Sequence, residues 1–283
     1  GLENLGCTCY MNSILQQLSS IKDVTATFSD QMQHLRSDIL ELLQLFSHMR
    51  FGMNKYYSTV KYCESYSKYN PDFTPREQED AVEYFSMLLD ACPKQTKELF
   101  QGEFKEIFSR GDINSKSDRL SERNEIFSTV GVTVAGIPDL SSSIHQLLAP
   151  EKLADDYVTE TGQKVEACRY TRFHSLPRFL VFHLKRFEYN LYNFTRYKIN
   201  SRFEFPTTLN MSEFSEEGTL YRLKGVVLHM GVAEGGHYVS VIRRDHKWIL
   251  CDDSNIQELD EENFLNVAYG GDNDRNAYLL FFE

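Results

Sequence analysis

Residues 4–13, with the sequence NLGCTCYMNS, constrain the chain most, because they place Cys9 between a glycine-containing turn and an apolar run with helical spacing. A thiol at a helix start lies at the positive end of the helix dipole, beside backbone N–H groups that lack helical partners, and both favour the thiolate form. The same N–H groups can stabilise an oxyanion. A thiolate nucleophile needs a base, and residues 235–238 (GGHY) supply His237, with Asp252 further along the chain. The fold must therefore bring the two ends of the chain together.

Helical periodicity dominates the beginning of the chain. Apolar residues recur at helix spacing at Ile39, Leu42, Leu43 and Phe46. Residues 70–75 contain two prolines and interrupt this pattern. A further helix is expected to begin at Thr74 or Pro75 and to end before Pro93.

Strand patterns replace helical ones from about residue 127. The expected strands lie at residues 127–134, 179–184, 221–229, 238–242, 248–251 and 278–282. Helices followed by strands predict an α+β fold whose two lobes meet at a cleft, with Cys9 on the helical lobe and His237 and Asp252 on the sheet lobe. Residues 109–123 are polar and charged, which predicts a loop or a poorly ordered tip.

Composition narrows the class of protein further. A chain of 283 residues can bury a substantial core as one large domain or two closely packed lobes. Its net charge of -11 argues against general binding of nucleic acid and against an anionic membrane surface. The charge suits a basic partner, although it also serves solubility. Six cysteines without a signal peptide or a long apolar run predict an intracellular protein of the cytoplasm or nucleus.

Five segments together resemble the signature motifs of the ubiquitin-specific proteases (USP/UCH-type, peptidase C19). They are residues 1–18, 77–85, 176–187, 235–253 and 276–282, in the order that the family has them. The resemblance covers essentially the whole chain, and its ending is similar to the branch of very large family members. Because the chain begins on the first motif and stops after the last, it resembles a catalytic domain excised from a longer protein.

The resemblance implies a fold and a division of the chain. The fold is α+β, a papain-like cysteine peptidase with a helical thumb, a β-rich palm and β fingers. The expected parts of this single catalytic domain, residues 1–283, are residues 1–98 for the thumb, 99–172 for the fingers with adjoining palm strands, and 173–283 for the palm.

The resemblance also assigns catalytic roles. Cys9 is the expected nucleophile, although a lone cysteine is more often an inert core residue. His237 is the expected base, and Asp252 is expected to orient it, with Asp253 as an auxiliary. Asn4 matches the family's side-chain donor to the oxyanion, while an asparagine at this place is also typical of a turn.

A channel for the basic, glycine-ended ubiquitin tail is implied as well. The residues expected to bind the tail are Gln78, Asp80, Glu83, Gly235, Gly236 and Tyr238. Asp80 is the expected partner of a tail arginine. The alternative to tail binding for the acidic residues is that they form an ordinary solvated face of the helix. For Glu83 a structural role is a further alternative.

The chain departs from the family at two places. Many members bind zinc in the fingers with two Cys-x-x-Cys pairs. Here Thr159 and Gly162 fall at the positions of the second pair, and Cys168 alone cannot build a site, so we expect no metal and no cofactor. Cys7 stands where the family usually has Asn or Ala. It is expected to pack as a small apolar residue, and the alternative is a thiol that reacts with an oxidised Cys9.

The implied activity is that of a deubiquitinating thiol isopeptidase, which hydrolyses the bond after the C-terminal glycine of ubiquitin on protein or polyubiquitin conjugates. The implied partners are ubiquitin and ubiquitinated proteins, without nucleic acid or membrane. Two alternatives stay open at this point: a peptidase for another ubiquitin-like modifier, and an inactive ubiquitin-binding module.

Overall fold

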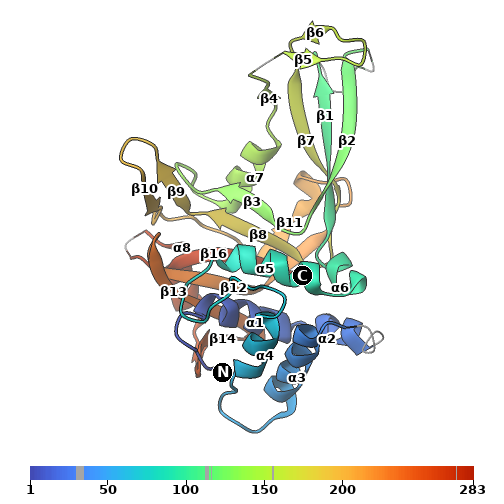
Figure 1. Ribbon diagram of the computed structural model, residues 1–283. Coiled ribbons are helices and arrows are strands. Elements are labelled where there is room, and N and C mark those ends of the chain that lie inside the picture. Colours follow the sequence, from blue (N-terminus) through green and yellow to red (C-terminus); the bar gives the residue numbers. More distant parts are fainter. Residues whose placement is uncertain (30–34, 112–114, 116, 155, 272) are drawn as a thin grey trace.

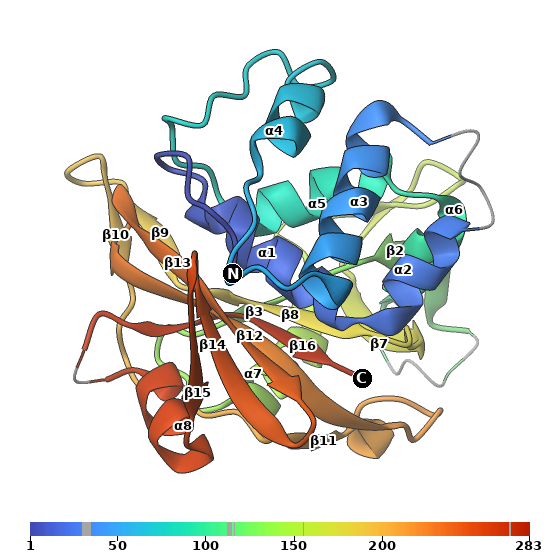
Figure 2. The ribbon, with the colours of Figure 1, turned by 90° about the horizontal axis from the view of Figure 1, so that it is seen from below.

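A helical lobe, a large β-sheet and a projecting β-extension make up the protein in the computed structural model, which describes residues 1–29, 35–111, 115, 117–154, 156–271 and 273–283 (Figure 1). The helical lobe contains α1 (Cys9–Ser20), α2 (Lys22–Ser29), α3 (Ser37–Phe51), α4 (Val60–Tyr66), α5 (Ala81–Ala91) and α6 (Lys94–Glu98). The turned view shows these helices together on one side of the sheet (Figure 2). The expected arrangement of helices first and strands after is therefore confirmed.

The large sheet has the strand order β15-β14-β13-β12-β16-β8-β3, and β11 pairs with β12 beside this path. The strands are β3 (Val130–Thr133), β8 (Leu180–Lys185), β11 (Thr208–Asn210), β12 (Leu220–Val232), β13 (Gly235–Arg244), β14 (Lys247–Asp252), β15 (Asn255–Leu259) and β16 (Asn276–Phe282). Neighbours are antiparallel except β3 and β8, which are parallel. Five of the expected strands overlap β8, β12, β13, β14 and β16.

Both faces of this sheet are buried. The helical lobe covers one face, and α7 (Leu140–Leu148) and α8 (Glu261–Tyr269) pack against the other. In β16 every residue is buried, with Phe281 in the core under the helical lobe and Leu280 and Phe282 in the second core. A strand buried on both faces has a continuous apolar sequence instead of an alternating one.

Helix α1 lies between the sheet and the other helices, and residues 9–18 are all buried. Buried polar side chains need hydrogen-bond partners. The amide nitrogen of Gln17 donates toward three acceptors on β12 and β13, at 2.8–3.2 Å: the Ser240 hydroxyl and the carbonyls of Val226 and Val241. These bonds fix α1, and with it Cys9, on the sheet.

Helix α5 begins later than its sequence suggests. The expected start at Thr74 or Pro75 is wrong, because the chain there forms turns and the helix begins at Ala81. Asp80 determines this start, since its carboxylate accepts hydrogen bonds from the backbone N–H groups of Val82 and Glu83 and caps the first turn.

The β-extension rises from the large sheet as a four-stranded sheet of its own (Figure 1). Its order is β2-β1-β7-β4, from β1 (Gly102–Ser109), β2 (Arg119–Phe127), β4 (Glu151–Lys152) and β7 (Cys168–Ser175). A short hairpin of β5 (Tyr157–Val158) and β6 (Lys164–Val165) lies at its tip. At its base the rings of Phe104, Phe127 and Phe173 pack with centroids 4.4–5.8 Å apart.

Residues 109–123 are only partly the loop that their polarity suggests. Residues 112–114 and 116 lie outside the described part of the chain, but Arg119–Phe127 form β2, paired along β1 from Gly102 to Ser109. β2 is an edge strand whose side chains are mostly exposed, so charged residues are tolerated there. The expected strand at residues 127–134 is likewise divided, because β2 ends at Phe127 and β3 begins at Val130.

A second hairpin, β9 (Phe187–Asn190) with β10 (Thr195–Lys198), projects on the side of the large sheet away from the β-extension (Figure 1). The short 3-10 helix η2 (Met211–Glu213) precedes β12. No helix among the described residues is long and apolar enough to cross a membrane.

Candidate active site

Cys9 is the first residue of α1 and is 3% exposed. The loop before it is folded around Asn4, whose Oδ1 accepts hydrogen bonds from the backbone N–H groups of Gly6 (3.0 Å) and Thr8 (3.1 Å). Gly6 has a φ of 135°, which only glycine adopts readily, and a side chain there would lie 3.0 Å from the Pro75 carbonyl oxygen. The sequence therefore builds a rigid turn that delivers Cys9 to the helix start.

His237 lies on β13 and Asp252 ends β14, the neighbouring strand. The Nε2 of His237 is 2.6 Å from Oδ1 of Asp252. The hydrogen bond to Cys9 is the largest cause that raises the pKa of His237 to about 9, burial opposes this, and Asp252 adds to the rise. Because Asp252 occupies Nε2, Nδ1 is the ring nitrogen left for the thiol. The expected partners Cys9, His237 and Asp252 thus meet across the cleft.

The charge on His237 distinguishes it from the neighbouring His229 on β12. Burial lowers the pKa of His229 to about 3, so its ring is neutral at physiological pH. His237, with a pKa of about 9, is an imidazolium there.

Asp253 does not replace Asp252 as the direct partner of His237. Its Oδ2 is 3.9 Å from Nε2 of His237, against 2.6 Å for Asp252. The side chain is held instead by two amides, because Asn4 Nδ2 donates to Oδ2 and Asn12 Nδ2 donates to Oδ1, both at 2.8 Å. Asp253 therefore joins the segment around Cys9 to the end of β14.

Asn12 was missed by the sequence analysis. It is 2% exposed in α1, and its amide also donates to the Glu3 carbonyl at 3.2 Å. The available signal was an amide within a helix that is expected to be buried, where a polar side chain needs a partner. The three side chains of His237, Asp252 and Asp253 also form a group close enough for a cation, with ligand atoms within 4.8 Å of one another. Their hydrogen bonds to protein groups account for this closeness.

The amide of Asn4 is oriented by these contacts. Its Oδ1 is occupied by the loop, so its Nδ2 points toward Asp253, and one of the two N–H bonds remains for a further acceptor. The role of Asn4 toward an oxyanion stays a prediction.

Gln78 bridges the helical lobe and the start of β13. Its Nε2 donates to the Gly236 carbonyl at 3.0 Å, and its Oε1 accepts from the Gly236 N–H at 3.1 Å. A side chain at position 236 would come within 2.5 Å of the His229 ring and closer still to the Met230 carbonyl. Glycine is therefore needed here for packing against β12, while Gly235 has open space around its Cα.

Two adjoining cavities of about 310 and 540 Å³ lie beside this bridge. They share Gln78, Glu79, Asp80, Phe187 and Arg196; Gly235 and Tyr238 line the first, and Glu83 lines the second. Glu79 and Arg196 were not among the predicted residues. Burial raises the pKa of Glu79.

Asp80 lies in this region with both carboxylate oxygens already engaged. Oδ1 accepts from the backbone of Val82 at 2.7 Å, and Oδ2 accepts from the Tyr278 hydroxyl. Its pairing with a basic residue of a partner stays a prediction, and these two contacts would compete with it. Glu83 is exposed and makes no comparable contact among the described residues.

At the tip of the β-extension, Thr159 and Gly162 form the turn of the β5–β6 hairpin. The Gly162 N–H donates to the Thr159 carbonyl at 2.9 Å, and Gly162 has a φ of 79°. Cys168 is half-buried on β7, and Cys7 is half-buried before α1, with its N–H bound to the Pro75 carbonyl at 2.7 Å. The absence of zinc stays a prediction.

A cysteine at the start of a helix, with a histidine and an aspartate on neighbouring strands of the sheet, fits the α+β fold of papain-like cysteine peptidases. The family model described as "Ubiquitin carboxyl-terminal hydrolase" matches residues 1–282. The chain therefore belongs to the ubiquitin carboxyl-terminal hydrolase family.

Known relatives are much longer than this chain. Human ubiquitin carboxyl-terminal hydrolase 34 is 27% identical over 98% of this chain and 9% of its own length. Ubiquitin carboxyl-terminal hydrolase 5 of Schizosaccharomyces pombe is 30% identical over 96% of this chain and 26% of its own length. The chain thus spans about a tenth to a quarter of these relatives.

Solved structures share the fold. The SAGA DUB module Ubp8/Sgf11/Sus1/Sgf73 bound to monoubiquitin has a TM-score of 0.84 at 22% identity, covering 100% of this chain and 68% of that chain. The same module bound to ubiquitin aldehyde has a TM-score of 0.83 at 23% identity with the same coverage.

Proposed function

We propose that this chain is a deubiquitinating thiol isopeptidase, which hydrolyses the bond after the C-terminal glycine of ubiquitin on proteins or polyubiquitin. The observation that carries the proposal is the Cys9–His237–Asp252 arrangement, with its 2.6 Å contact between His237 and Asp252. Family membership over residues 1–282 and relatives named ubiquitin carboxyl-terminal hydrolases support the substrate. In this proposal residues 1–98 form the thumb, 99–172 the fingers with adjoining palm strands, and 173–283 the palm.

The geometry supports a two-step reaction. The Cys9 thiolate attacks the carbonyl of the terminal glycine, and the resulting oxyanion is stabilised by the Cys9 N–H and the free N–H of Asn4. The imidazolium of His237 then protonates the leaving lysine amine, the C–N bond breaks, and a thioester to Cys9 remains. His237, now neutral, removes a proton from water, which attacks the thioester and releases the ubiquitin carboxylate. Asp252 orients His237 in both steps, and Asp253 has an auxiliary role. No cofactor takes part.

The cavities beside Gln78 support a path for the ubiquitin tail. Asp80 and Glu83 give this region carboxylates that suit a basic tail, and Gly235 leaves room beside the backbone of β13. Gly236 and Tyr238 lie along the same strand. Arg196, from β10, adds the opposite charge to both cavities.

We also propose ubiquitin and its conjugates as the partners, without nucleic acid or membrane, in the cytoplasm or nucleus. The net charge of -11 and six free cysteines support this proposal.

A ubiquitin probe with an electrophile in place of its terminal carboxylate tests the proposed function. Wild-type protein should be captured covalently and should hydrolyse a fluorogenic ubiquitin-tail substrate. The Cys9→Ala variant should do neither while still binding ubiquitin, and Cys7→Ala should behave as wild type. Losing a nucleophile costs several powers of ten in turnover, so residual activity of Cys9→Ala within about tenfold of wild type would refute the assignment.

The same measurement separates the alternatives. An inactive ubiquitin-binding module would bind the probe without covalent capture. A peptidase for another modifier would react faster with a probe carrying that modifier's tail than with the ubiquitin probe.

A further inference from the structure

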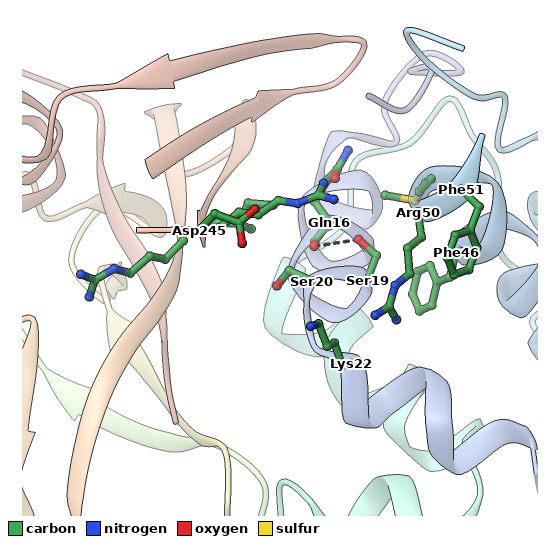
Figure 3. A pocket seen from close by; sticks show the side chains of 12 residues that line it. Gln16, Ser19, Ser20, Lys22, Phe46, Arg50, Phe51 and Asp245 are labelled. Atoms are coloured by element: carbon green, nitrogen blue, oxygen red, sulfur yellow. Dashed lines mark hydrogen bonds between the residues drawn. The ribbon is translucent and has the colours of Figure 1, made fainter. Parts of the chain in front are cut away.

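Another cavity, of about 430 Å³, lies at the far ends of the two elements that carry the proposed nucleophile and base. It is bordered by the last turns of α1, the start of α2, the end of α3 and the β13–β14 turn. Figure 3 shows Gln16, Ser19 and Ser20 on the helix, with Asp245 on one side and Arg50 on the other. The cavity lies between the helical lobe and the sheet, apart from Cys9 and His237 at the opposite ends of α1 and β13.

The lining of this cavity is basic in a chain of net charge -11. Among the described residues, four basic ones line it, Lys22, Arg50, Arg243 and Arg244, together with one carboxylate, that of Asp245. Clustered like charges repel one another, so an arrangement of this kind is stabilised by an anion between them.

None of the four cations forms an ion pair with a carboxylate in the part of the chain that the structure describes. Among the residues that the structure describes, Arg50 contacts the Thr25 hydroxyl, at 3.4 Å, and the face of the Phe51 ring. Arg243 lies over the ring of Trp248, 5.6 Å from its centroid. Elsewhere in the molecule basic side chains commonly have acidic partners, as Arg178 has in Asp23.

The side-chain amide of Gln16, in the cavity wall, is independent evidence for a ligand that accepts a hydrogen bond. Gln16 is 5% exposed, and its Nε2 is enclosed without a hydrogen-bond partner among the described residues. The next residue, Gln17, shows the usual situation in this helix, because its Nε2 has three acceptors on the sheet. Buried donors are almost always satisfied, so an unsatisfied one at the wall of a basic cavity indicates a place for an anionic acceptor.

We propose that this cavity binds a soluble small molecule that carries several phosphate groups. The volume lies in the range of small-molecule sites and exceeds what one phosphate fills. Phosphate oxygens accept charge-assisted hydrogen bonds from arginine and lysine. The ligand bridges Lys22 and Arg50 of the helical lobe to Arg244 of the sheet lobe, whereas the Arg243 guanidinium stays over Trp248. The Gln16 amide turns toward the ligand as a neutral donor.

Binding is tested with sodium tripolyphosphate and, separately, inositol hexakisphosphate, by calorimetric titration and thermal unfolding at constant ionic strength. Both measurements are made on the Cys9→Ala variant, and neither depends on enzymatic turnover. Their outcome is therefore independent of the proposed function. We expect one molecule bound per chain and a higher Tm, whereas sodium chloride of equal ionic strength has neither effect.

Charge variants locate the site. Lys22→Gln with Arg50→Gln should weaken binding at least about tenfold, since two charge-assisted contacts are lost. The matched control, Lys164→Gln with Arg110→Gln in the fingers, removes the same charges from exposed positions and should leave binding unchanged. Asp245→Asn should tighten binding, because it removes the carboxylate of the lining.

Three results would overturn the proposal: no binding of either compound, equal weakening by the fingers variant, or binding only to vesicles that contain phosphatidylinositol bisphosphate. The Tm of each unliganded variant is measured first. If Lys22→Gln with Arg50→Gln unfolds the protein, Gln16→Met serves in its place, because it keeps the shape of the side chain and removes the donor. Unchanged binding by a folded Gln16→Met would then count against the site.

Discussion

Replacing Cys9 by alanine should lower the pKa of His237, because the hydrogen bond to Cys9 is the largest cause that raises it to about 9. The rise from 6.5 to about 9 corresponds to about 3 kcal/mol of preference for the imidazolium. His237 is partly exposed, so solvent screening reduces this figure. We therefore expect the variant to lose about 1–2 kcal/mol of that preference, a pKa lower by about one unit or more.

An NMR titration of the histidine ring protons measures this change directly. The His237 resonance is assigned by comparison with a His237→Gln variant, since the chain has 8 histidines. Asp252→Asn should also lower the pKa, by less than Cys9→Ala does, because Asp252 is the smaller cause. A His237 pKa that is the same in wild type and Cys9→Ala would refute the reasoning.

The same interaction makes a pH-dependent contribution to stability. The folded pKa of His237 is raised above its unfolded value of 6.5, so the stabilisation is fully present below pH 6.5 and is lost as the pH rises through about 9. The difference in unfolding free energy between wild type and His237→Gln should therefore shrink between these pH values. Urea unfolding at pH 6 and pH 9.5 measures it, and a difference that grows with pH would contradict the sign.

Three further predictions concern neighbouring groups. Asp252→Ala should reduce turnover more than Asp253→Ala, because Asp252 is 2.6 Å from His237 Nε2 and Asp253 is 3.9 Å away. Steady-state hydrolysis by the two variants measures this order, and the reverse order would give Asp253 the orienting role. Asp80→Arg should raise KM for ubiquitin substrates and also lower the unfolding free energy by about 1 kcal/mol, because it removes the cap of α5. Glu83→Arg makes the same charge change without removing the cap, so it should lower the unfolding free energy less than Asp80→Arg does. Equal KM values for wild type and Asp80→Arg at low salt would exclude Asp80 from the tail path. Finally, elemental analysis should find no stoichiometric zinc and chelators should leave the Tm unchanged, whereas about one zinc per chain would show that the fingers bind metal.

Short sequence patterns were enough to predict that Cys9 lies at a helix start and that His237 lies on the sheet lobe. A glycine turn before a helical run and two glycines before a histidine are patterns within a few residues. The order of helices and strands then predicts which lobe carries each. Asp252 follows because β14 is adjacent to β13 in both sequence and sheet.

Roles that depend on contacts between residues far apart in the sequence could not be predicted from such short patterns. Asn12 is defined by its bond to Asp253, and Gln78 by its pairing with Gly236, and neither partner is near in sequence. The start of α5 was misplaced because Pro75 is a common first helical residue, whereas the cap at Asp80 starts the helix. The polar strand β2 has its hydrogen bonds on one side only, which composition does not reveal.

The hydrogen bonds between Asn4, Asn12 and Asp253 have a consequence for the order in which the protein is made. The segment around Cys9 leaves the ribosome before His237 on β13 and before Asp253, which follows β14. At the usual rate of about 5–20 residues per second, Cys9 waits on the order of 10–50 s for His237. During that interval the thiol has no imidazolium beside it. A nascent domain therefore cannot carry out the proposed reaction on ubiquitin near the ribosome, and catalytic competence begins only when synthesis of the palm is complete.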